Sequence, residues 1–162
     1  MTMKTNLNLE TGIKLPPPII YLAALIIGMV IDDFWPLSLF PEIWGHIIGS
    51  VFILVSILLV PTFLIQFKKA GTTFDVRKSA TTLITDGPYR YLRHPMYTSG
   101  VLYLVGCGLF SNNWWMLLLP PSTFLLLVVC RLTDEEEMLS IHFAEAWEAY
   151  KSKTYAFLPF IW

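Results

Sequence analysis

Long apolar stretches alternate with short polar segments along the chain. Residues 15–31 contain no charged side chain, and the 25 residues of 43–67 contain no Asp, Glu, Lys or Arg. A helix of 25 residues is about 37 Å long, enough to cross a hydrocarbon layer of about 30 Å. We therefore expect two transmembrane helices here, the first opened by the prolines at 16–18 and the second kinked at Pro61.

A third apolar block, residues 94–130, is too long for a single crossing. Its 37 residues contain no Asp, Glu, Lys or Arg, and one straight helix of that length would extend about 55 Å. The turn-forming sequence Ser-Asn-Asn at 111–113 predicts a hairpin of two short arms. The tryptophans at 114–115 suit a membrane interface, and the prolines at 120–121 are expected to interrupt the second arm.

The basic residues predict the orientation. All eleven lie before the first stretch, between the second and third, or after the fourth predicted helix. Since cytoplasmic loops carry an excess of Lys and Arg, these three regions and both termini are predicted to be cytoplasmic. The charged segment 133–153 then follows, with apolar positions at helical spacing that predict an amphipathic helix. Those positions are Leu139, Phe143, Ala146, Trp147 and Tyr150.

The expected fold is an all-α integral membrane protein of about four transmembrane helices, in one domain of residues 1–162. Residues 1–67 form two generic spans and residues 68–162 carry the motifs. Composition agrees, since 55% of residues are hydrophobic and 14% charged, against about 25% charged in soluble domains. A net charge of −1 gives no sign of a nucleic-acid partner. Cys107 and Cys130 lie in apolar runs and are interpreted as core residues, not metal ligands.

Two polar clusters lie at the predicted cytoplasmic ends of the hairpin. One is Asp-Gly-Pro-Tyr-Arg-Tyr-Leu-Arg-His-Pro-Met-Tyr at 86–97, and the other is Arg-Leu-Thr-Asp-Glu-Glu-Glu at 131–137. Because a tight hairpin brings its ends together, the clusters are predicted to be neighbours. Their arginine, histidine, tyrosine and carboxylate groups suit a polar, charged cofactor.

Several of these side chains also have structural interpretations. Arginines and tyrosines at this depth suit headgroup anchors and the interfacial aromatic belt. These are Arg90, Arg93, Tyr89, Tyr91 and Tyr97.

The second cluster has local alternatives of its own. Thr133 and Glu136 have the spacing of a capping box, which we favour for Glu136 on spacing alone, and Arg131 and Glu135 that of a helix-surface ion pair. The histidines outside both clusters, His46 and His142, are interpreted as structural. His94 is different, because a basic group is not needed merely to fill space at the start of a span.

The sequence Gly-Pro-Tyr-Arg-Tyr-Leu-Arg-His-Pro-Met-Tyr at 87–97, followed by Glu-Glu-Glu-Met-Leu at 135–139, resembles a known superfamily. It is the isoprenylcysteine carboxyl methyltransferase and phospholipid methyltransferase superfamily, whose members carry R-H-P-x-Y, an apolar hairpin and then E-E-x-x-L. The similarity extends from about residue 71 to the C-terminus. Departures are Ala144 where a glycine is common, Trp147 for a tyrosine, and Tyr-Ala at 155–156 for Val-Pro.

The resemblance implies an S-adenosylmethionine site at the cytosolic face, closed over by the C-terminal segment, with no metal. Family cofactor contacts correspond by position to Leu83, Ile84, Tyr89, His94, Pro95, Met96, Tyr97, Glu135 and Glu136. The arginine that assists the substrate in family members corresponds most nearly to Arg131, one residue out of register with the eukaryotic pattern. Arg131 and Arg93 are the candidate catalytic residues.

The implied function is methyl transfer to a lipophilic or lipid substrate in the membrane, similar to an isoprenylcysteine carboxylate. One alternative keeps the chemistry and changes the acceptor to a phospholipid amine or a thiol. Another is a non-catalytic membrane subunit or transport component, although charged residues inside the spans, which would favour transport, are absent. A reductase is a further possibility, without a glycine-rich dinucleotide fingerprint to support it.

Overall fold

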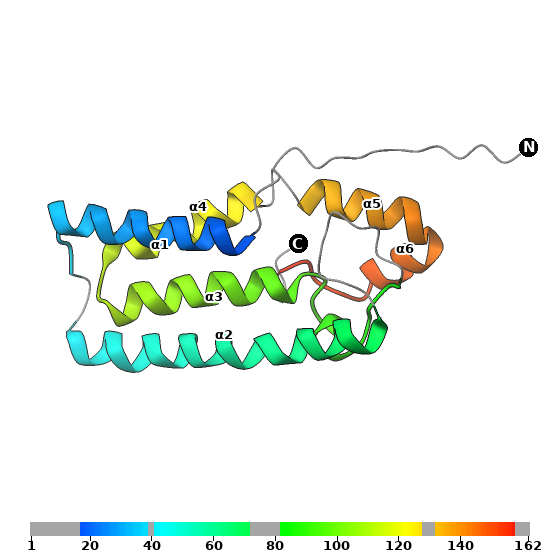
Figure 1. Cartoon of the computed structure of the whole chain (residues 1–162), viewed down its shortest axis with the longest axis horizontal. Coiled ribbons are helices and arrows are strands. Elements are labelled where there is room, and N and C mark those ends of the chain that lie inside the picture. The colour runs from blue at the N-terminus through cyan, green and yellow to red at the C-terminus, as the bar shows by residue number, and fades with distance from the viewer. Residues whose placement is uncertain (1–16, 39–40, 72–81, 128–131, 158–162) are drawn as a thin grey trace, which may run out of the picture.

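The computed structural model describes residues 17–38, 41–71, 82–127 and 132–157, and it is built from helices (Figure 1). The elements in chain order are α1 (Pro17–Phe34), α2 (Glu42–Ala70), the 3-10 helix η1 (Gly87–Arg90), α3 (Pro95–Phe110), α4 (Trp114–Leu127), α5 (Thr133–Phe143) and α6 (Glu145–Lys151). In the described part of the chain the extended backbone pairs only at an isolated parallel bridge between Leu92 and Tyr155. The predicted all-α fold is confirmed.

Small residues bring α2 and α3 into close contact. A Cβ added to Gly49 would overlap the backbone of Phe110, and one added to Gly106 would come within 2.9 Å of the Ile53 amide nitrogen. Further along the same contact, the Ser56 hydroxyl donates a 2.8 Å hydrogen bond to the carbonyl oxygen of Ser99. Close backbone approach strengthens helix packing where lipid removes the hydrophobic driving force. The long helix α2 therefore fixes the position of α3.

The predicted hairpin is confirmed, with its turn at residues 111–113. Asn112 adopts a φ of 51°, and Oδ1 of Asn113 accepts a 3.0 Å hydrogen bond from the Met116 amide at the start of α4. The expected interruption at residues 120–121 is wrong, because α4 continues through both prolines to Leu127. The two prolines lack the amide N–H that would donate to the preceding turn, and the packing of α4 against α1 and α3 compensates for this loss. The packing on α1 is close, because a Cβ added to Gly28 would come within 2.8 Å of α4 side chains.

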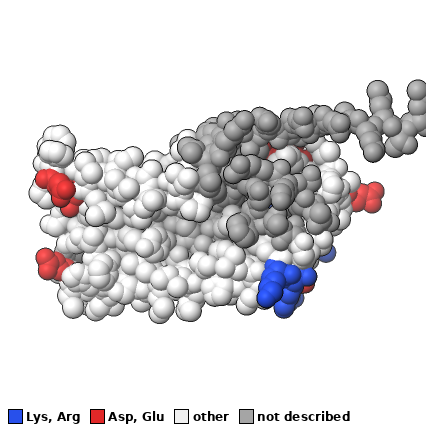
Figure 2. All heavy atoms as spheres, in the orientation of Figure 1, with Lys and Arg blue, Asp and Glu red and all other residues white. Residues whose placement is uncertain are grey.

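One described helix, α2, is long and apolar enough to cross a membrane, and α3 is a shorter apolar helix. Many large apolar side chains on α1 and α2 are exposed, among them Ile27, Val51 and Leu58. The charged side chains in view gather at the two ends of the bundle, with an uncharged surface between them (Figure 2). An apolar exterior between polar ends is typical of a bundle surrounded by lipid.

The predicted single amphipathic helix at 133–153 is wrong, because the chain turns at Ala144. Ala144 has a φ of 43° and a ψ of −116°, which ends α5 and begins α6. The turn directs Trp147 and Tyr150 into the protein, where Trp147 is 1% exposed. Ala146, expected on the apolar face, is exposed instead.

The start of α3 lies well short of the end of α2, as Figure 1 shows. Ser56 is level with Ser99 in this antiparallel pair, so Pro95 is level with about residue 60. Residues 61–70 of α2 then extend about 15 Å further. η1 packs beside this extension, with the ring of Tyr89 edge-on to Phe67 at 6.0 Å. The start of α3, where the first polar cluster ends, therefore lies about 15 Å inward of the end of α2.

Candidate functional site

The two polar clusters are neighbours, as predicted from the hairpin. Nε of Arg93 donates a 2.8 Å hydrogen bond to Oε1 of Glu136, and Nε2 of His94 lies 3.3 Å from the same oxygen. Arg93 and His94 are each 6% exposed and Glu136 is 8% exposed. The start of α3 and the first turn of α5 thus share a buried arginine, histidine and carboxylate.

These contacts decide between the alternatives left open for Glu136 and Arg93. The capping box is wrong, because the N-cap of α5 is Leu132 and no side chain caps it. Glu136 points inward to Arg93, and Arg93 is bound inside the protein and does not anchor the chain at lipid headgroups. Arg90 remains exposed, as an anchor would be.

The Glu136 carboxylate is ionised. Burial alone would raise its pKa, but hydrogen bonds from His94 and Arg93 and the Arg93 charge lower the pKa to about 2. Its second oxygen, Oε2, lies 3.2 Å from Nζ of Lys151, whose side chain is 41% exposed. Oε1 therefore has two buried partners and Oε2 has one partner at the surface.

The C-terminal segment 154–157 runs over the start of α3 and binds it through the backbone. The amides of Arg93 and His94 donate to the carbonyl oxygens of Tyr155 and Ala156 at 2.7 and 3.1 Å. Nη1 of Arg93 donates to the carbonyl oxygen of Thr154 at 2.5 Å. These bonds satisfy amides at the N-terminus of α3, which no side chain caps. The segment thereby holds Arg93 and His94 in place.

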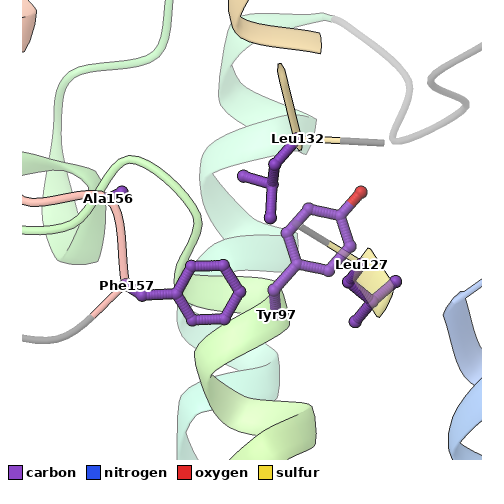
Figure 3. Close-up of a cluster of buried hydrophobic side chains, with 5 residues drawn as sticks. All are labelled: Tyr97, Leu127, Leu132, Ala156 and Phe157. Atoms are coloured by element: carbon purple, nitrogen blue, oxygen red, sulfur yellow. The ribbon is translucent and has the colours of Figure 1, made fainter. Parts of the chain in front are cut away.

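Figure 3 shows a cluster of buried apolar side chains built around the rings of Tyr97 and Phe157. The ring of Tyr97 stacks on Phe157 at 6.1 Å with an interplanar angle of 15°, and Leu127, Leu132 and Ala156 are buried with them. The Tyr97 hydroxyl donates a 3.0 Å hydrogen bond to Oε2 of Glu135. This cluster joins the end of α4 to the start of α3 and to the C-terminal segment.

The three tyrosines of the first polar cluster occupy different environments. Tyr97 and Tyr89 are buried, which argues against an interfacial belt for them, whereas Tyr91 is exposed. The carbonyl oxygen of Tyr89 accepts a 2.7 Å hydrogen bond from the Tyr150 hydroxyl. Burial raises the pKa of both Tyr89 and Tyr150, so their phenol groups stay neutral at physiological pH.

The remaining residues singled out from the sequence differ in burial and in whether they contact the site. Pro95 is fully buried, Met96 packs against the buried apolar cluster, and Leu83 and Ile84 are partly buried. Arg131 lies outside the described residues. His46 and His142 are exposed, and their rings lie against Phe110 and Phe143.

Sequence reasoning missed Lys151, Thr154 and Phe157 as parts of the site. Nothing in their spacing indicates a contact with α3, since the turn at Ala144 brings them there. The only available signal was the glycine that the family commonly places where this chain has Ala144. Among the described residues no group of three or more His, Cys, Asp or Glu is placed to hold a metal ion.

The fold and the buried charge cluster define a helical bundle of the membrane-protein type with one polar site at a helix end. Residues 44–146 match the family of phospholipid methyltransferases, and the chain belongs to that family. The resemblance found in the R-H-P-x-Y and E-E-x-x-L motifs is thus confirmed.

Two curated relatives are similar over part of their length. The protein-S-isoprenylcysteine O-methyltransferase of Schizosaccharomyces pombe is 32% identical over 98 residues, which cover 57% of this chain and 42% of that protein. The nickel-cobalt-cadmium resistance protein NccN of Alcaligenes xylosoxydans xylosoxydans is 30% identical over 82 residues, covering 51% of this chain and 38% of that protein. The chain therefore spans less than half the length of each.

The fold is similar to a solved structure of the eukaryotic intramembrane Ras methyltransferase, isoprenylcysteine carboxyl methyltransferase. The TM-score is 0.67 at 20% identity, with 89% of this chain and 52% of that chain covered. At this identity the likeness concerns the fold.

Proposed function

We propose that the chain is an integral membrane methyltransferase that uses S-adenosylmethionine and methylates a lipophilic acceptor. The observation that carries the proposal is the buried, ionised Glu136 held by Arg93 and His94, in a member of the phospholipid methyltransferase family. A buried carboxylate with this many partners is costly to build and is typical of a binding site.

Four crossings are part of the proposal. α2 is long enough alone, while α1, α3 and α4 have 18, 16 and 14 residues, or roughly 27, 24 and 21 Å. Because the arms α3 and α4 are shorter than α2, we place the start of α3 below the membrane surface. Lys68 and Lys69 lie in the last turn of α2, at the same end of the bundle as the start of α3. Basic residues favour the cytoplasmic side, so we assign the site and both termini to that side.

The cofactor site is proposed at the meeting of α3, α5 and the C-terminal segment. Oε2 of Glu136 offers acceptor capacity toward solvent, and His94 and the Arg93 guanidinium hold the carboxylate in a fixed orientation. The buried rings of Tyr97 and Tyr89 are the apolar groups that we assign to this site, together with Leu83, Ile84, Pro95, Met96 and Glu135. This donor and acceptor set fits the amino, hydroxyl and adenine groups of S-adenosylmethionine.

S-adenosylmethionine, when bound, supplies an already activated methyl group. The chain's residues then need only bind, orient and exclude water, which is consistent with a site that offers positioning groups. Because Glu136 is ionised, it can accept hydrogen bonds at neutral pH without first losing a proton. Arg93 makes its hydrogen bonds within the protein, so we assign it to positioning Glu136 and leave substrate contact to Arg131.

The depth of the site favours a lipophilic acceptor. A polar cofactor reaches the site from the cytoplasm, while an acceptor with a long apolar tail reaches it from the surrounding lipid about 15 Å inward of the end of α2. An isoprenylcysteine carboxylate is the acceptor we propose first. A phospholipid amine or a lipophilic thiol could also reach a site at this depth. The acceptor screen described below distinguishes these acceptors from the isoprenylcysteine carboxylate.

The test is calorimetric titration of detergent-purified protein with S-adenosylhomocysteine. We expect saturable binding that is weakened at least tenfold in His94→Asn and unchanged in the matched control His142→Asn, whose ring is exposed and makes no contact with Glu136 among the described hydrogen bonds. A second pair of variants is Glu136→Gln, which should also weaken binding, and its control Glu137→Gln, which should not, because Glu137 is exposed. A well-folded wild type that binds no S-adenosylhomocysteine would favour the non-catalytic alternative.

The acceptor needs a separate screen with labelled methyl donor. Prenylated cysteine analogues, phosphatidylethanolamine and small thiols are presented in mixed micelles. Incorporation into the prenylated cysteine carboxylate alone supports the first proposal, and incorporation into one of the others reassigns the acceptor. Label in none of them, despite cofactor binding, would contradict all three acceptor classes.

A further inference from the structure

Lys151 differs from the other partners of Glu136 in a way that suggests a separate role. The side chains of Arg93 and His94 are 3% and 5% exposed, whereas that of Lys151 is 41% exposed. Both buried groups bind Oε1, and Lys151 alone is placed on Oε2 among the described residues. Oε1 of Glu136 is therefore held by two buried side chains, whereas Oε2 is bound by one partly exposed side chain.

The two oxygens differ in what they can still accept. A carboxylate oxygen accepts about two hydrogen bonds, so the partners of Oε1 already use its capacity. Oε2 is bound by one flexible ammonium group that remains partly in water. A ligand that hydrogen-bonds to Glu136 must therefore do so at Oε2, where Lys151 lies.

Moving the Lys151 side chain would leave the surrounding backbone in place. Lys151 is the last residue of α6, and its carbonyl oxygen accepts a hydrogen bond from Nη1 of Arg93 at 3.4 Å. The carbonyl oxygen of Thr154 accepts from the same nitrogen. These backbone contacts hold the end of α6 independently of the Lys151 ammonium group.

We infer that Lys151 is an intramolecular competitor for Oε2 of Glu136, the atom at which the methyl donor's polar hydrogens bind. The inference rests on the proposed function. The ammonium group of Lys151 takes up part of the acceptor capacity of Oε2 in this structure. It moves into solvent when amino or hydroxyl groups of the donor bind to that oxygen in its place. Lys151 thereby weakens donor and product binding while keeping the buried carboxylate neutralised.

The experiment compares the affinity of S-adenosylhomocysteine for wild type, Lys151→Gln and Lys151→Met in detergent. Since exposed ion pairs are weak, removing the competitor should tighten binding by about two- to fivefold. Lys153→Gln is the matched control, since Lys153 is an exposed lysine two residues away, and its affinity should not change. Lys151→Arg restores a cation and should return the affinity to near the wild-type value.

Salt gives a second measurement that a structural role would not reproduce. Because salt screens an exposed ion pair, the difference between wild type and Lys151→Gln should shrink at about 1 M salt. Affinity that is equal or weaker in both Lys151→Gln and Lys151→Met, with unchanged melting temperature, would overturn the inference and leave the proposed function standing. A folded wild type that fails to bind S-adenosylhomocysteine overturns the proposed function and this inference with it.

Discussion

The two ends of the bundle are built on different principles. At the end where α1 stops and α3 turns into α4, exposed aromatic side chains form a shallow apolar surface, and Nε1 of Trp115 donates a 2.6 Å hydrogen bond to the carbonyl oxygen of Trp35. The residues that line this surface are Phe34, Trp35, Pro36, Leu37 and Trp115. Of the acidic residues at this end, Asp33 and Glu42 are exposed, and Asp32 is half-buried with its Oδ1 lacking a hydrogen-bond partner among the described residues.

At the other end charges are buried, and each buried charge has partners from a different element. Arg93 at the start of α3 binds Glu136 of α5 and the carbonyl oxygen of Thr154. Exposed charges need no partners, whereas a buried charge is costly without them, and at this end Arg93 and Glu136 have them. The difference is that the buried, paired charges on which the proposed site rests lie at one end, whereas the other end presents an apolar surface.

The largest effect should come from removing a buried charge. Glu136→Gln leaves the Arg93 guanidinium buried without its counterion, so we expect a loss of about 3–5 kcal/mol of unfolding free energy. Glu42→Gln at the opposite end should change it by less than about 0.5 kcal/mol. Denaturant unfolding in detergent measures both variants. Equal stabilities for the two would contradict the contrast between the ends.

The pH dependence of stability tests the same carboxylate without changing its shape. The pKa of Glu136 is lowered from 4.5 to about 2, so its contribution is fully present above pH 4.5 and is lost as the pH falls through about 2. The shift corresponds to about 3 kcal/mol. Melting of wild type and Glu136→Gln across this range should show a loss in wild type that the variant lacks. Parallel curves would argue against an ionised Glu136 in the folded state.

Adding one methyl group at Gly49 should separate α2 and α3 near the end of the bundle that carries the hairpin turn. Gly49→Ala places a Cβ against the Phe110 backbone, so we expect a loss of about 1–3 kcal/mol. Ser50→Ala, on the exposed side of α2, is the control and should be nearly neutral. Because Ser56 and Ser99 lie on the same contact, Gly49→Ala should also weaken S-adenosylhomocysteine binding. Unchanged melting would mean that the helices can separate without cost.

The smallest expected effect is a gain in stability. Ala144 has a positive φ of 43° between α5 and α6, where glycine is accommodated with less strain. Ala144→Gly should therefore stabilise the protein by about 0.5–1 kcal/mol and leave Lys151 and Trp147 in place. Ala149→Gly, at an exposed position in the middle of α6, is the control and should destabilise the protein by a similar amount. A loss of stability in Ala144→Gly would show that the turn is not strained.

Much of the fold and part of the site followed from the sequence. Turn residues at 111–113 inside a 37-residue apolar block required a hairpin, because a single helix would exceed the membrane thickness. The hairpin in turn required that His94 and Glu136 lie near each other. The motifs at 87–97 and 135–139 were enough to indicate the family.

Only the tertiary structure decided how the charges pair. Glu136 satisfied the local spacing of a capping box, but the rotation of α5 against α3 directs its carboxylate to Arg93. The prolines at 120–121 predicted an interruption, yet packing on α1 and α3 holds α4 continuous. Hydrophobic length and turn chemistry are local and can be read from the chain. The placement of Lys151 on Glu136 depends on a turn at Ala144 and on contacts between residues 15 positions apart, which no local pattern encodes.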